Sequence, residues 1–245
     1  MPAIHIVVLS GGVGARMGAG RPKQFLPLAG RPVLVHSLAI FSGFEPASPI
    51  CLVAPATYIE ETRSIVQAAG FQAALRLVPG GADRHASTLA GWESVQACEP
   101  APADEDLLLI HDAARPLVER AEIQRLVQAF EDDPALEIAS LAAPISETIV
   151  AAEALPGPMA RSVDRSKFFA IKTPQAVRIG CLRRMMAMRS GAEGDGSGGY
   201  TDLLTWGEAH GVSGRLVPAG PRNLKLTHPA DLVWFESLLD APADE

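Results

Sequence analysis

The feature that most constrains this chain is the stretch LSGGVGARMGAGRPKQFLPL at residues 9–28. It directly follows the apolar, β-branched run at 4–9, which is typical of a buried parallel strand. Five glycines between residues 11 and 20 let the backbone turn sharply and approach a ligand without a Cβ atom in the way. Arg16 and Lys23 add two cations to the same loop. Such a loop after a strand predicts a phosphate cradle of backbone N–H groups and fixed positive charge.

Two familiar phosphate-binding loops do not fit this stretch. The dinucleotide pattern Gly-x-Gly-x-x-Gly would use Gly12 and Gly14 but needs a third glycine where Met17 stands, so a dehydrogenase is excluded. The P-loop ends in Gly-Lys-Ser/Thr, whereas Lys23 lies between a proline and a glutamine. We therefore predict a third kind of nucleotide site. A flexible surface turn is the alternative, and the combination of many glycines with basic residues disfavours it.

Beyond this loop, short apolar runs alternate with segments of helical periodicity, as expected for parallel βαβ units. We predict an α/β fold: a Rossmann-like, mostly parallel sheet covered by helices on both faces. All 245 residues fit one domain of ordinary size, 1–245. Further strands are predicted at 49–53, 75–78, 107–110, 137–142 and 215–217. Helices are predicted at 32–41, 58–69, 89–98, 121–130, 178–189 and 230–239, with another ending at 210 behind a Thr201-Asp202 cap.

Two loops after predicted strands carry candidate ligand contacts. Glycines at 80 and 81 precede Arg84, and Ser87 or Thr88 either caps the following helix or contacts a ligand. The strand at 107–110 ends in His111-Asp-Ala-Ala-Arg-Pro116, and ligands gather at the carboxyl ends of strands in open α/β sheets. Asp112 is a candidate metal or ribose contact and Arg115 a candidate phosphate contact; alternatively the two form a local ion pair that organises a turn.

The region from 143 to 173 has a different character. Short alternating segments at 147–150, 160–165 and 168–173 surround the turn-prone Leu155-Pro-Gly-Pro158. This pattern predicts a projecting β-hairpin arm, which is marginally stable unless it packs on something. A second subunit is the natural cover, so we predict a homodimer that forms through the arm. The glycine-rich stretch 191–199 is predicted to be a loop and not a domain linker.

Charge and cysteine usage narrow the function classes. The net charge of −7 argues against a nucleic-acid partner, since no excess of positive charge is available to neutralise a phosphate backbone. No signal peptide and no apolar run long enough for a membrane span is visible. The cysteines at 51, 98 and 181 lie far apart and suggest neither a zinc site nor a disulfide framework. A reducing cytoplasm is the expected location.

Taken in order, the motifs resemble those of the 2-C-methyl-D-erythritol 4-phosphate cytidylyltransferase family of the non-mevalonate isoprenoid pathway. The resemblance covers nearly the whole chain, and each motif is weak alone whereas the ordered set is specific. The motifs are Pro22-Lys-Gln24 after the glycine loop, Gly80-Gly81 with Arg84 and Ser87, His111-Asp-Ala-Ala-Arg-Pro116, Val163-Asp-Arg165, Thr173-Pro-Gln175, Thr201-Asp202 and Asn223-Leu-Lys225.

The resemblance implies a reaction and assigns roles. The phosphate of the acceptor attacks the α-phosphorus of CTP in the presence of Mg²⁺, and pyrophosphate leaves; no general base is required. By resemblance, Arg16, Lys23 and Lys225 are catalytic and stabilise the charge around the reacting phosphorus. The nucleotide is bound by Ser10, Gly11, Gly12, Gly14, Gly81, Arg84 and Ser87. The polyol phosphate is bound by Asp112, Arg115, Thr148, Arg165, Thr173 and Thr201, with Thr148 and Arg165 coming from the second subunit, and Asp112 also contacts the metal, directly or through water.

The sequence departs from the family pattern at three points. The first loop opens Leu9-Ser-Gly-Gly where the family usually has Pro-Ala-Ala-Gly, and this opening is similar to that of ribitol-5-phosphate cytidylyltransferases. Leu203 stands where an acidic residue often follows Thr-Asp, and Ala82-Asp-Arg84 replaces the usual Asp-x-Arg. Another polyol phosphate such as ribitol 5-phosphate is therefore the alternative acceptor, although Ala114 argues against ribitol. A catalytically silent nucleotide sensor is a third hypothesis, which the two cations Lys23 and Lys225 disfavour.

Overall fold

The computed structural model describes residues 2–11, 22–42, 44, 49–71, 75–191 and 200–240. Its core is a seven-stranded sheet in the order β11-β7-β10-β6-β1-β4-β5. Neighbouring strands pair in parallel except for β10, which is antiparallel to both β6 and β7. The strands of this sheet are β1 (Ile4–Leu9), β4 (Ile50–Ala54), β5 (Leu75–Pro79), β6 (Leu107–Asp112), β7 (Ile138–Pro144), β10 (Phe169–Arg178) and β11 (Gly214–Pro218).

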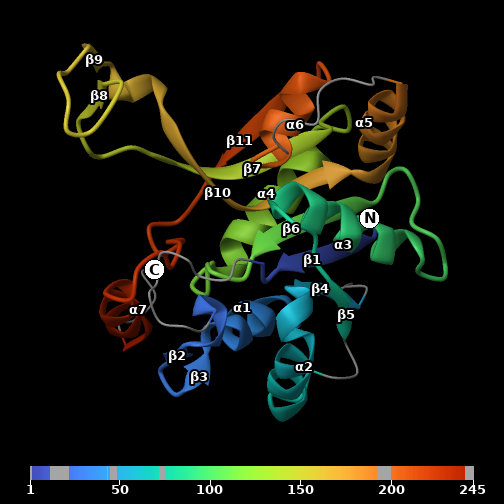
Figure 1. Ribbon diagram of the computed structural model, residues 1–245. Coiled ribbons are helices and arrows are strands. Elements are labelled where there is room, and N and C mark those ends of the chain that lie inside the picture. The colour runs from blue at the N-terminus through green and yellow to red at the C-terminus, as the bar shows by residue number, and fades with distance from the viewer. Residues whose placement is uncertain are drawn as a thin grey trace.

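Helices cover both faces of the sheet, as predicted (Figure 1). Alternate strand residues explain this arrangement: Ile6 and Val8 point to one apolar cluster, while Val7 and Leu9 point to the other. The first cluster includes side chains of α1 (Val33–Ser42), α2 (Ile59–Ala68) and α4 (Arg120–Asp132). The second includes side chains of α3 (Arg84–Gln96), α5 (Ile179–Gly191) and α6 (Leu203–Ala209).

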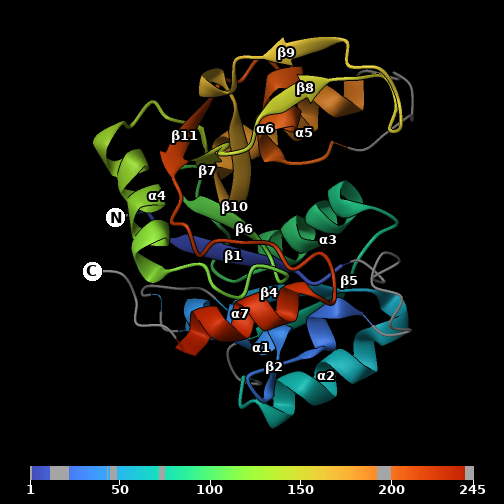
Figure 2. The same ribbon diagram turned by 90° about the vertical axis from the view of Figure 1, so that its left-hand side faces the viewer.

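The last helix, α7 (Asp231–Asp240), belongs to a third, smaller cluster. Phe235 packs there with Leu28 of the short hairpin β2–β3 (Pro27–Leu28 and Arg31–Pro32), with Val33 of α1 and with Leu226. Figure 2 shows α7 beside α1 and β2. The C-terminal part of the chain therefore returns to the residues that follow the glycine-rich loop. This return places the segment 219–227, which follows β11 and leads toward α7, beside the end of β6.

The arm is a two-stranded hairpin, β8 (Ile149–Ala151) paired with β9 (Arg161–Val163), which projects from the body (Figures 1 and 2). The prediction for the third arm segment was wrong. Residues 169–173 belong to β10, and Phe169 pairs with Pro144 of β7 in the central sheet. Alternation of side chains looks the same in an arm strand and in a sheet strand, so the pattern alone did not separate them.

The start of α3 also differs from the prediction. The helix begins at Arg84, not at residue 89, because Asp83 is its N-cap and accepts a hydrogen bond from Ala86 N. The prediction that Ser87 or Thr88 caps this helix was therefore wrong. Both hydroxyls lie inside the first turns and donate back to the carbonyls of Asp83 and Arg84, respectively.

Candidate functional site

The candidate site lies where the carboxyl ends of β1, β4 and β6 meet. Asp112, the last residue of β6, is paired in register with Leu9, the last residue of β1, which in turn is paired with Val53. The glycine-rich loop leaves β1 at this edge. The sheet therefore brings Asp112 to the point where parallel α/β sheets place their ligands.

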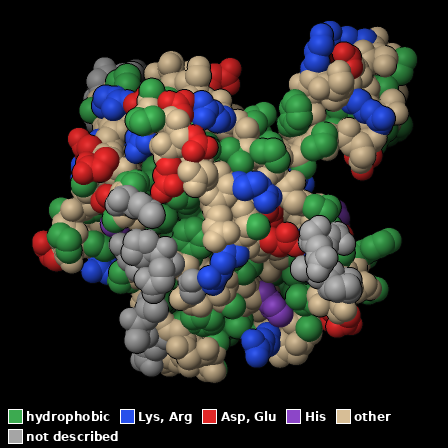
Figure 3. Space-filling view, turned by 180° about the vertical axis from the view of Figure 1, so that it is seen from behind, with side chains coloured by type: hydrophobic (Ala, Val, Ile, Leu, Met, Phe, Trp, Pro, Cys, Tyr) green, Lys and Arg blue, Asp and Glu red, His purple; other side chains and the backbone are tan. Residues whose placement is uncertain are grey.

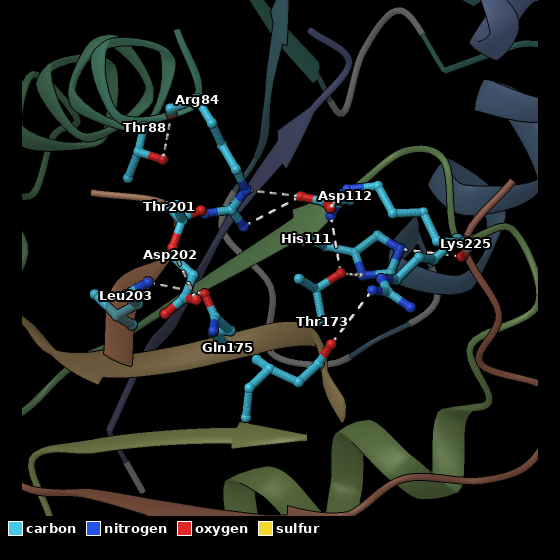
Figure 4. Close-up of polar contacts among 12 residues, drawn as sticks. Arg84, Thr88, His111, Asp112, Thr173, Gln175, Thr201, Asp202, Leu203 and Lys225 are labelled. Atoms are coloured by element: carbon cyan, nitrogen blue, oxygen red, sulfur yellow. Dashed lines mark hydrogen bonds and ion pairs between the residues drawn. The ribbon is translucent and has the colours of Figure 1, made fainter. Parts of the chain in front are cut away.

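Two cations from distant parts of the chain converge on the carboxylate of Asp112 (Figure 4). Arg84 donates through Nε to Oδ1 at 3.1 Å, and its Nη2 lies 3.1 Å from the same oxygen. Lys225 Nζ donates to Oδ2 at 2.7 Å. Burial of the carboxyl group would raise its pKa, but the charges of Arg84 and Lys225 and the hydrogen bond from Lys225 outweigh it, so the pKa of Asp112 lies well below its usual range.

Arg115 is a buried cation beside this pair, with 7% of its surface exposed. It donates from Nη1 to the carbonyl of Asn223 at 3.3 Å and from Nη2 to the carbonyl of Ile171 at 3.5 Å. Its Nε has no hydrogen-bond partner among the described residues. Burial lowers the pKa of Arg115, opposed by the charge of Asp112. An incompletely paired, desolvated guanidinium is suited to bind an anion.

The alternative of a local Asp112–Arg115 ion pair was wrong. The two residues share a backbone hydrogen bond, from Arg115 N to the carbonyl of Asp112 at 3.0 Å. The ion-pair partners of the carboxylate are Arg84 and Lys225. Both partners are far away in the sequence, which is why spacing along the chain did not reveal them.

Thr173 and His111 complete the buried floor of the site. The hydroxyl of Thr173 accepts a hydrogen bond from Asp112 N at 3.0 Å and lies 3.2 Å from His111 Nδ1. His111 Nε2 lies 3.2 Å from the carbonyl of Arg115. The imidazole is fully buried, and burial lowers its pKa to about 4, so it is neutral at pH 7. Both side chains are buried; Thr173 contacts the backbone of Asp112 directly, and His111 contacts Thr173.

The second glycine loop packs tightly against the start of α3. A Cβ atom at Gly81 would lie 2.4 Å from Ala86 Cβ, so this close approach requires glycine. Ser87 lies next to the first glycine-rich loop, because a Cβ atom at Gly11 would be 3.8 Å from its Oγ. Gly11, at the start of the first loop, therefore lies beside the first turns of α3, which follows the second loop. Whether Gly11, Gly81, Arg84 and Ser87 contact the nucleotide stays a prediction.

Ser10 and Lys23 lie at either end of the glycine-rich loop. The backbone of Ser10 is already used, since its N–H donates to the carbonyl of Val53 and its carbonyl accepts from Gln24 Nε2. The Oγ of Ser10 is buried and has no partner among the described residues, so the hydroxyl is the polar group left for a ligand. Lys23 Nζ donates to the carbonyl of Leu226 at 2.7 Å, and Leu226 directly follows Lys225 in the sequence.

The other predicted residues are placed differently. Arg16, Gly12 and Gly14 lie outside the described residues. The carbonyl of Thr201 accepts from Arg84 Nη1 at 3.3 Å, which brings it to the edge of the site (Figure 4). Thr148 and Arg165 are exposed, and Arg165 donates to the carbonyl of Ser146 at the base of the arm. They belong to the arm, and within one chain they do not contact Asp112 or its partners Arg84 and Lys225.

The described residues offer little for a metal ion by themselves. Across 2–11, 22–42, 44, 49–71, 75–191 and 200–240, no group of three or more His, Cys, Asp or Glu side chains is arranged to hold one. Both oxygens of Asp112 already accept from cations. Mg²⁺ commonly binds through one or two carboxylates together with substrate phosphates and waters. A divalent cation at this edge would therefore need most of its ligands from bound phosphates and water, and the contact of Asp112 with a metal stays a prediction.

Two buried residues at the site were not predicted as functional. Glu122 and Asn223 are both 0% exposed, and Asn223 Nδ2 donates to Glu122 Oε1 at 3.2 Å and to the carbonyl of Thr173 at 3.0 Å. Glu122 stands at an acidic position in the first turn of an amphipathic helix, where a carboxylate is ordinary. The only sequence signal was Asn223 within the motif that contains Lys225.

Comparisons with known proteins match the chain to one family over almost its whole length. The family described as IspD, 2-C-methyl-D-erythritol 4-phosphate cytidylyltransferase, matches residues 4–241. The chain is 36% identical to the protein of that name from Leptospira interrogans, over 94% of this chain and 89% of the relative. It is 34% identical to the protein of the same name from Bacillus velezensis, over 96% of this chain and 95% of the relative.

Solved structures give the same result. A crystal structure of a 4-diphosphocytidyl-2C-methyl-D-erythritol synthase superimposes with a TM-score of 0.78 at 27% identity, covering 98% of this chain and all of that one. The 2-C-methyl-D-erythritol 4-phosphate cytidylyltransferase from Thermus thermophilus superimposes with a TM-score of 0.68 at 27% identity, covering 98% and 99%. The chain belongs to the IspD family of 2-C-methyl-D-erythritol 4-phosphate cytidylyltransferases.

Proposed function

We propose that this protein transfers the cytidylyl group of CTP to 2-C-methyl-D-erythritol 4-phosphate, giving CDP-methylerythritol and pyrophosphate. The observation that carries the proposal is the convergence of Arg84, Lys225, Lys23 and Arg115 on the edge of the sheet at Asp112. Two polyanions that react with each other need such an excess of positive charge. The family and the names of the relatives supply the identity of both substrates.

In the proposed reaction an oxygen of the acceptor phosphate forms a bond to the α-phosphorus of CTP. The bond from that phosphorus to the bridging oxygen breaks, and its electron pair leaves with pyrophosphate. The nucleophile is already an anion, so the chain supplies position and charge rather than a base. Lys225 and Lys23 reach the site from the two ends of the chain, and in the proposal they neutralise the reacting phosphates together with Arg16.

The proposed acceptor subsite lies around Asp112, Arg115 and Thr173. Arg115 has an unpartnered Nε, and it is held by the carbonyls of Asn223 and Ile171 rather than by a carboxylate. Among the described residues no carboxylate forms an ion pair with Arg115, so in the proposal its charge acts on the phosphate of the polyol. Mg²⁺ or another divalent cation would supply further neutralisation of charge when bound with the triphosphate, and Asp112 would hold it, directly or through water.

The arm supports a homodimer. Val150, Leu155, Met159 and Phe168 are between 47% and 98% exposed on a lobe that stands away from the body (Figure 3). A hairpin of three-residue strands that exposes this much apolar surface is stabilised when it packs on another subunit. In the proposal, the arm also carries Thr148 and Arg165 to the acceptor subsite of the partner.

The remaining proposals concern the domain organisation and the cellular location of the enzyme. We treat residues 1–245 as a single nucleotidyltransferase domain, with the arm as an excursion from it. Among the described residues no helix has the length and hydrophobicity required to cross a bilayer. Cys51, Cys98 and Cys181 are free thiols. A cytoplasmic location stays a prediction.

The test is a steady-state assay of pyrophosphate release with CTP, Mg²⁺ and one of two acceptors. We expect kcat/KM for methylerythritol 4-phosphate to exceed that for ribitol 5-phosphate by about 100-fold or more. The ribitol alternative is not favoured by the family or by the relatives. Comparable turnover of both acceptors would overturn the assignment of the acceptor, and no pyrophosphate with either would overturn the reaction. Chelation of divalent cations is expected to stop turnover, and Mg²⁺ to restore it.

A further inference from the structure

Glu122 is a buried carboxylate with an unusual set of partners. Its Oε2 accepts from Glu119 N at 2.8 Å, which is the ordinary contact of a residue in the first turn of a helix. Its Oε1 accepts from Gly220 N at 2.7 Å and from Asn223 Nδ2 at 3.2 Å, about a hundred residues further along the chain. Within the described part of the chain, no Lys or Arg forms an ion pair with Glu122. The contact at the start of the helix uses only Oε2, so Oε1 is left to bind the distant residues Gly220 and Asn223.

The second oxygen fixes the segment 219–227, which has no helix or strand of its own. Asn223 links Glu122 to the site. Its side-chain amide also donates to the carbonyl of Thr173, and its backbone carbonyl accepts from Arg115. Three residues later, Leu226 N donates to the carbonyl of Ala114 at 2.8 Å. Lys225 thus lies between two anchored residues, Asn223 and Leu226.

The consequence is geometric. Lys225 is 43% exposed at the side chain, and a long, flexible side chain is placed chiefly by the backbone that carries it. The position of its ammonium group relative to Asp112 therefore depends on where the 219–227 backbone lies. Arg115 depends on the same backbone, because one of the two hydrogen bonds of its guanidinium goes to the carbonyl of Asn223.

We propose that Glu122 is a positioning residue for cytidylyl transfer: it anchors segment 219–227 through Gly220 and Asn223 and so sets Lys225 and Arg115 against Asp112. Glu122 is fully buried, so in this proposal it acts without touching either substrate. This inference rests on the proposed function, which assigns Lys225 and Arg115 to the reacting phosphates. The buried charge is stabilised by three N–H donors and by its place at the N-terminus of α4.

The main test is Glu122→Gln. Whichever oxygen the amide nitrogen replaces, it faces an N–H donor, either Glu119 N or the pair Gly220 N and Asn223 Nδ2. We expect kcat to fall by about 10- to 100-fold, because small displacements of reacting groups cost this much. The KM for CTP is expected to change by less than about threefold, since the glycine loops are untouched.

Asp106→Asn is the matched control. Asp106 is also a buried carboxylate, and it accepts from Ala3 N and Ala103 N, both at 2.8 Å. It precedes β6, whereas Asp112 ends β6, roughly 20 Å away at the rise of an extended strand. This variant is expected to lose thermal stability comparably and to keep kcat within about twofold. Equal losses of kcat in both variants would overturn the proposal.

Asn223→Ala is the second variant, for use if Glu122→Gln does not fold. It removes the other end of the contact and also an Oδ1 that is buried without a partner, so it is expected to fold more readily. It should lower kcat as well. Where both fold, the double variant should be no slower than the slower single variant, because the two residues act through one contact. Strictly additive effects, or single variants with kcat within twofold of wild type, would contradict the proposal.

Hydrogen exchange separates this inference from the proposed function. The Leu226 N–H, bonded to Ala114, is expected to exchange faster in Glu122→Gln than in wild type and to be unchanged in Asp106→Asn. If wild type released no pyrophosphate, the function would fail while exchange still reported the anchoring. If wild type were active and neither exchange nor kcat changed in Glu122→Gln, the positioning role alone would fail.

Discussion

The site at the end of β6 and the arm formed by β8 and β9 are built in opposite ways. Asp112 is 8% exposed and holds together residues more than a hundred positions apart, namely Lys225 on one oxygen and Arg84 on the other. In the arm, Leu155 is 98% exposed and polar contacts such as Asp164 to Ser166 are local. The body thus preorganises charge within one chain, while the arm presents surface that one chain leaves uncovered.

This difference assigns separate roles to the two regions. A buried network has one arrangement and fixes its charges before substrate arrives, which is the requirement for electrostatic stabilisation of a reaction. An exposed hairpin has few contacts that fix it and gains them from a partner. We therefore expect substitutions in the body to affect the rate of chemistry and substitutions in the arm to affect use of the acceptor.

The largest expected effect is that of Lys225→Ala. Loss of a cation that acts on developing charge is expected to lower kcat by about a thousandfold, with CTP still bound. Assays of pyrophosphate release measure kcat, and equilibrium binding of CTP measures separately whether the nucleotide still binds. A kcat within tenfold of wild type would remove Lys225 from the chemistry and would weaken the contrast between body and arm.

A second prediction concerns pH and the buried floor of the body. Burial lowers the pKa of His111 to about 4, below the usual 6.5. Between these pH values the unfolded chain binds a proton at His111 that the folded chain does not bind. The free energy of unfolding is therefore unaffected by this group above pH 6.5 and decreases as the pH falls to 4. The loss is about 3 kcal/mol of unfolding free energy, from the size of the shift.

Urea unfolding of wild type and His111→Gln between pH 7 and pH 4 checks this. The variant is expected to be less stable at pH 7 and to show a flatter pH dependence over this window. Asp112 does not interfere, because its pKa is depressed and its contribution is lost only below the unfolded value, near pH 4. Parallel pH curves for wild type and variant would show that His111 does not titrate in this way.

The smallest of these effects is expected in the arm. Arg165→Ala removes an exposed guanidinium that, in the proposed dimer, contacts the acceptor phosphate of the partner. Loss of one charge-assisted contact should lower kcat/KM for the acceptor by about 10- to 100-fold, while the KM for CTP and the melting temperature stay nearly constant. Lys167→Ala, a neighbouring exposed cation, is the control and should leave both substrates unaffected. An unchanged kcat/KM in Arg165→Ala would contradict the role of the arm.

Much of the fold was predictable because it depends on local patterns. Apolar runs and helical periodicity located the strands and helices of the βαβ units to within a few residues, except that α3 begins five residues earlier than predicted. That start was missed because Asp83 was grouped with the loop and the later hydroxyls were given the role of cap. The place of β10 in the central sheet was missed, because a pattern along one strand carries no information about its neighbours, and residues 168–173 were assigned to the arm.

The candidate site was predictable only in part, for a similar reason. The resemblance supplied Asp112 and Lys225 as a set, and the structure shows them in contact. Glu122 was not predicted, because an acid in the first turn of a helix is common and its partners Gly220 and Asn223 lie about a hundred residues away. Contacts between residues so far apart in the sequence depend on the return of the chain beside β6, and no short motif predicts that return.

The most direct test of the account is subunit complementation between Lys225→Ala and Arg165→Ala. Each variant alone is expected to be nearly inactive at low acceptor concentration. In co-expressed mixed dimers, one site has wild-type Lys225 from its own body and wild-type Arg165 from the arm of its partner, so random pairing should restore about a quarter of wild-type activity. A mixture that is no more active than the mean of the two variants would contradict the claim that one chain's body and a second chain's arm form one site.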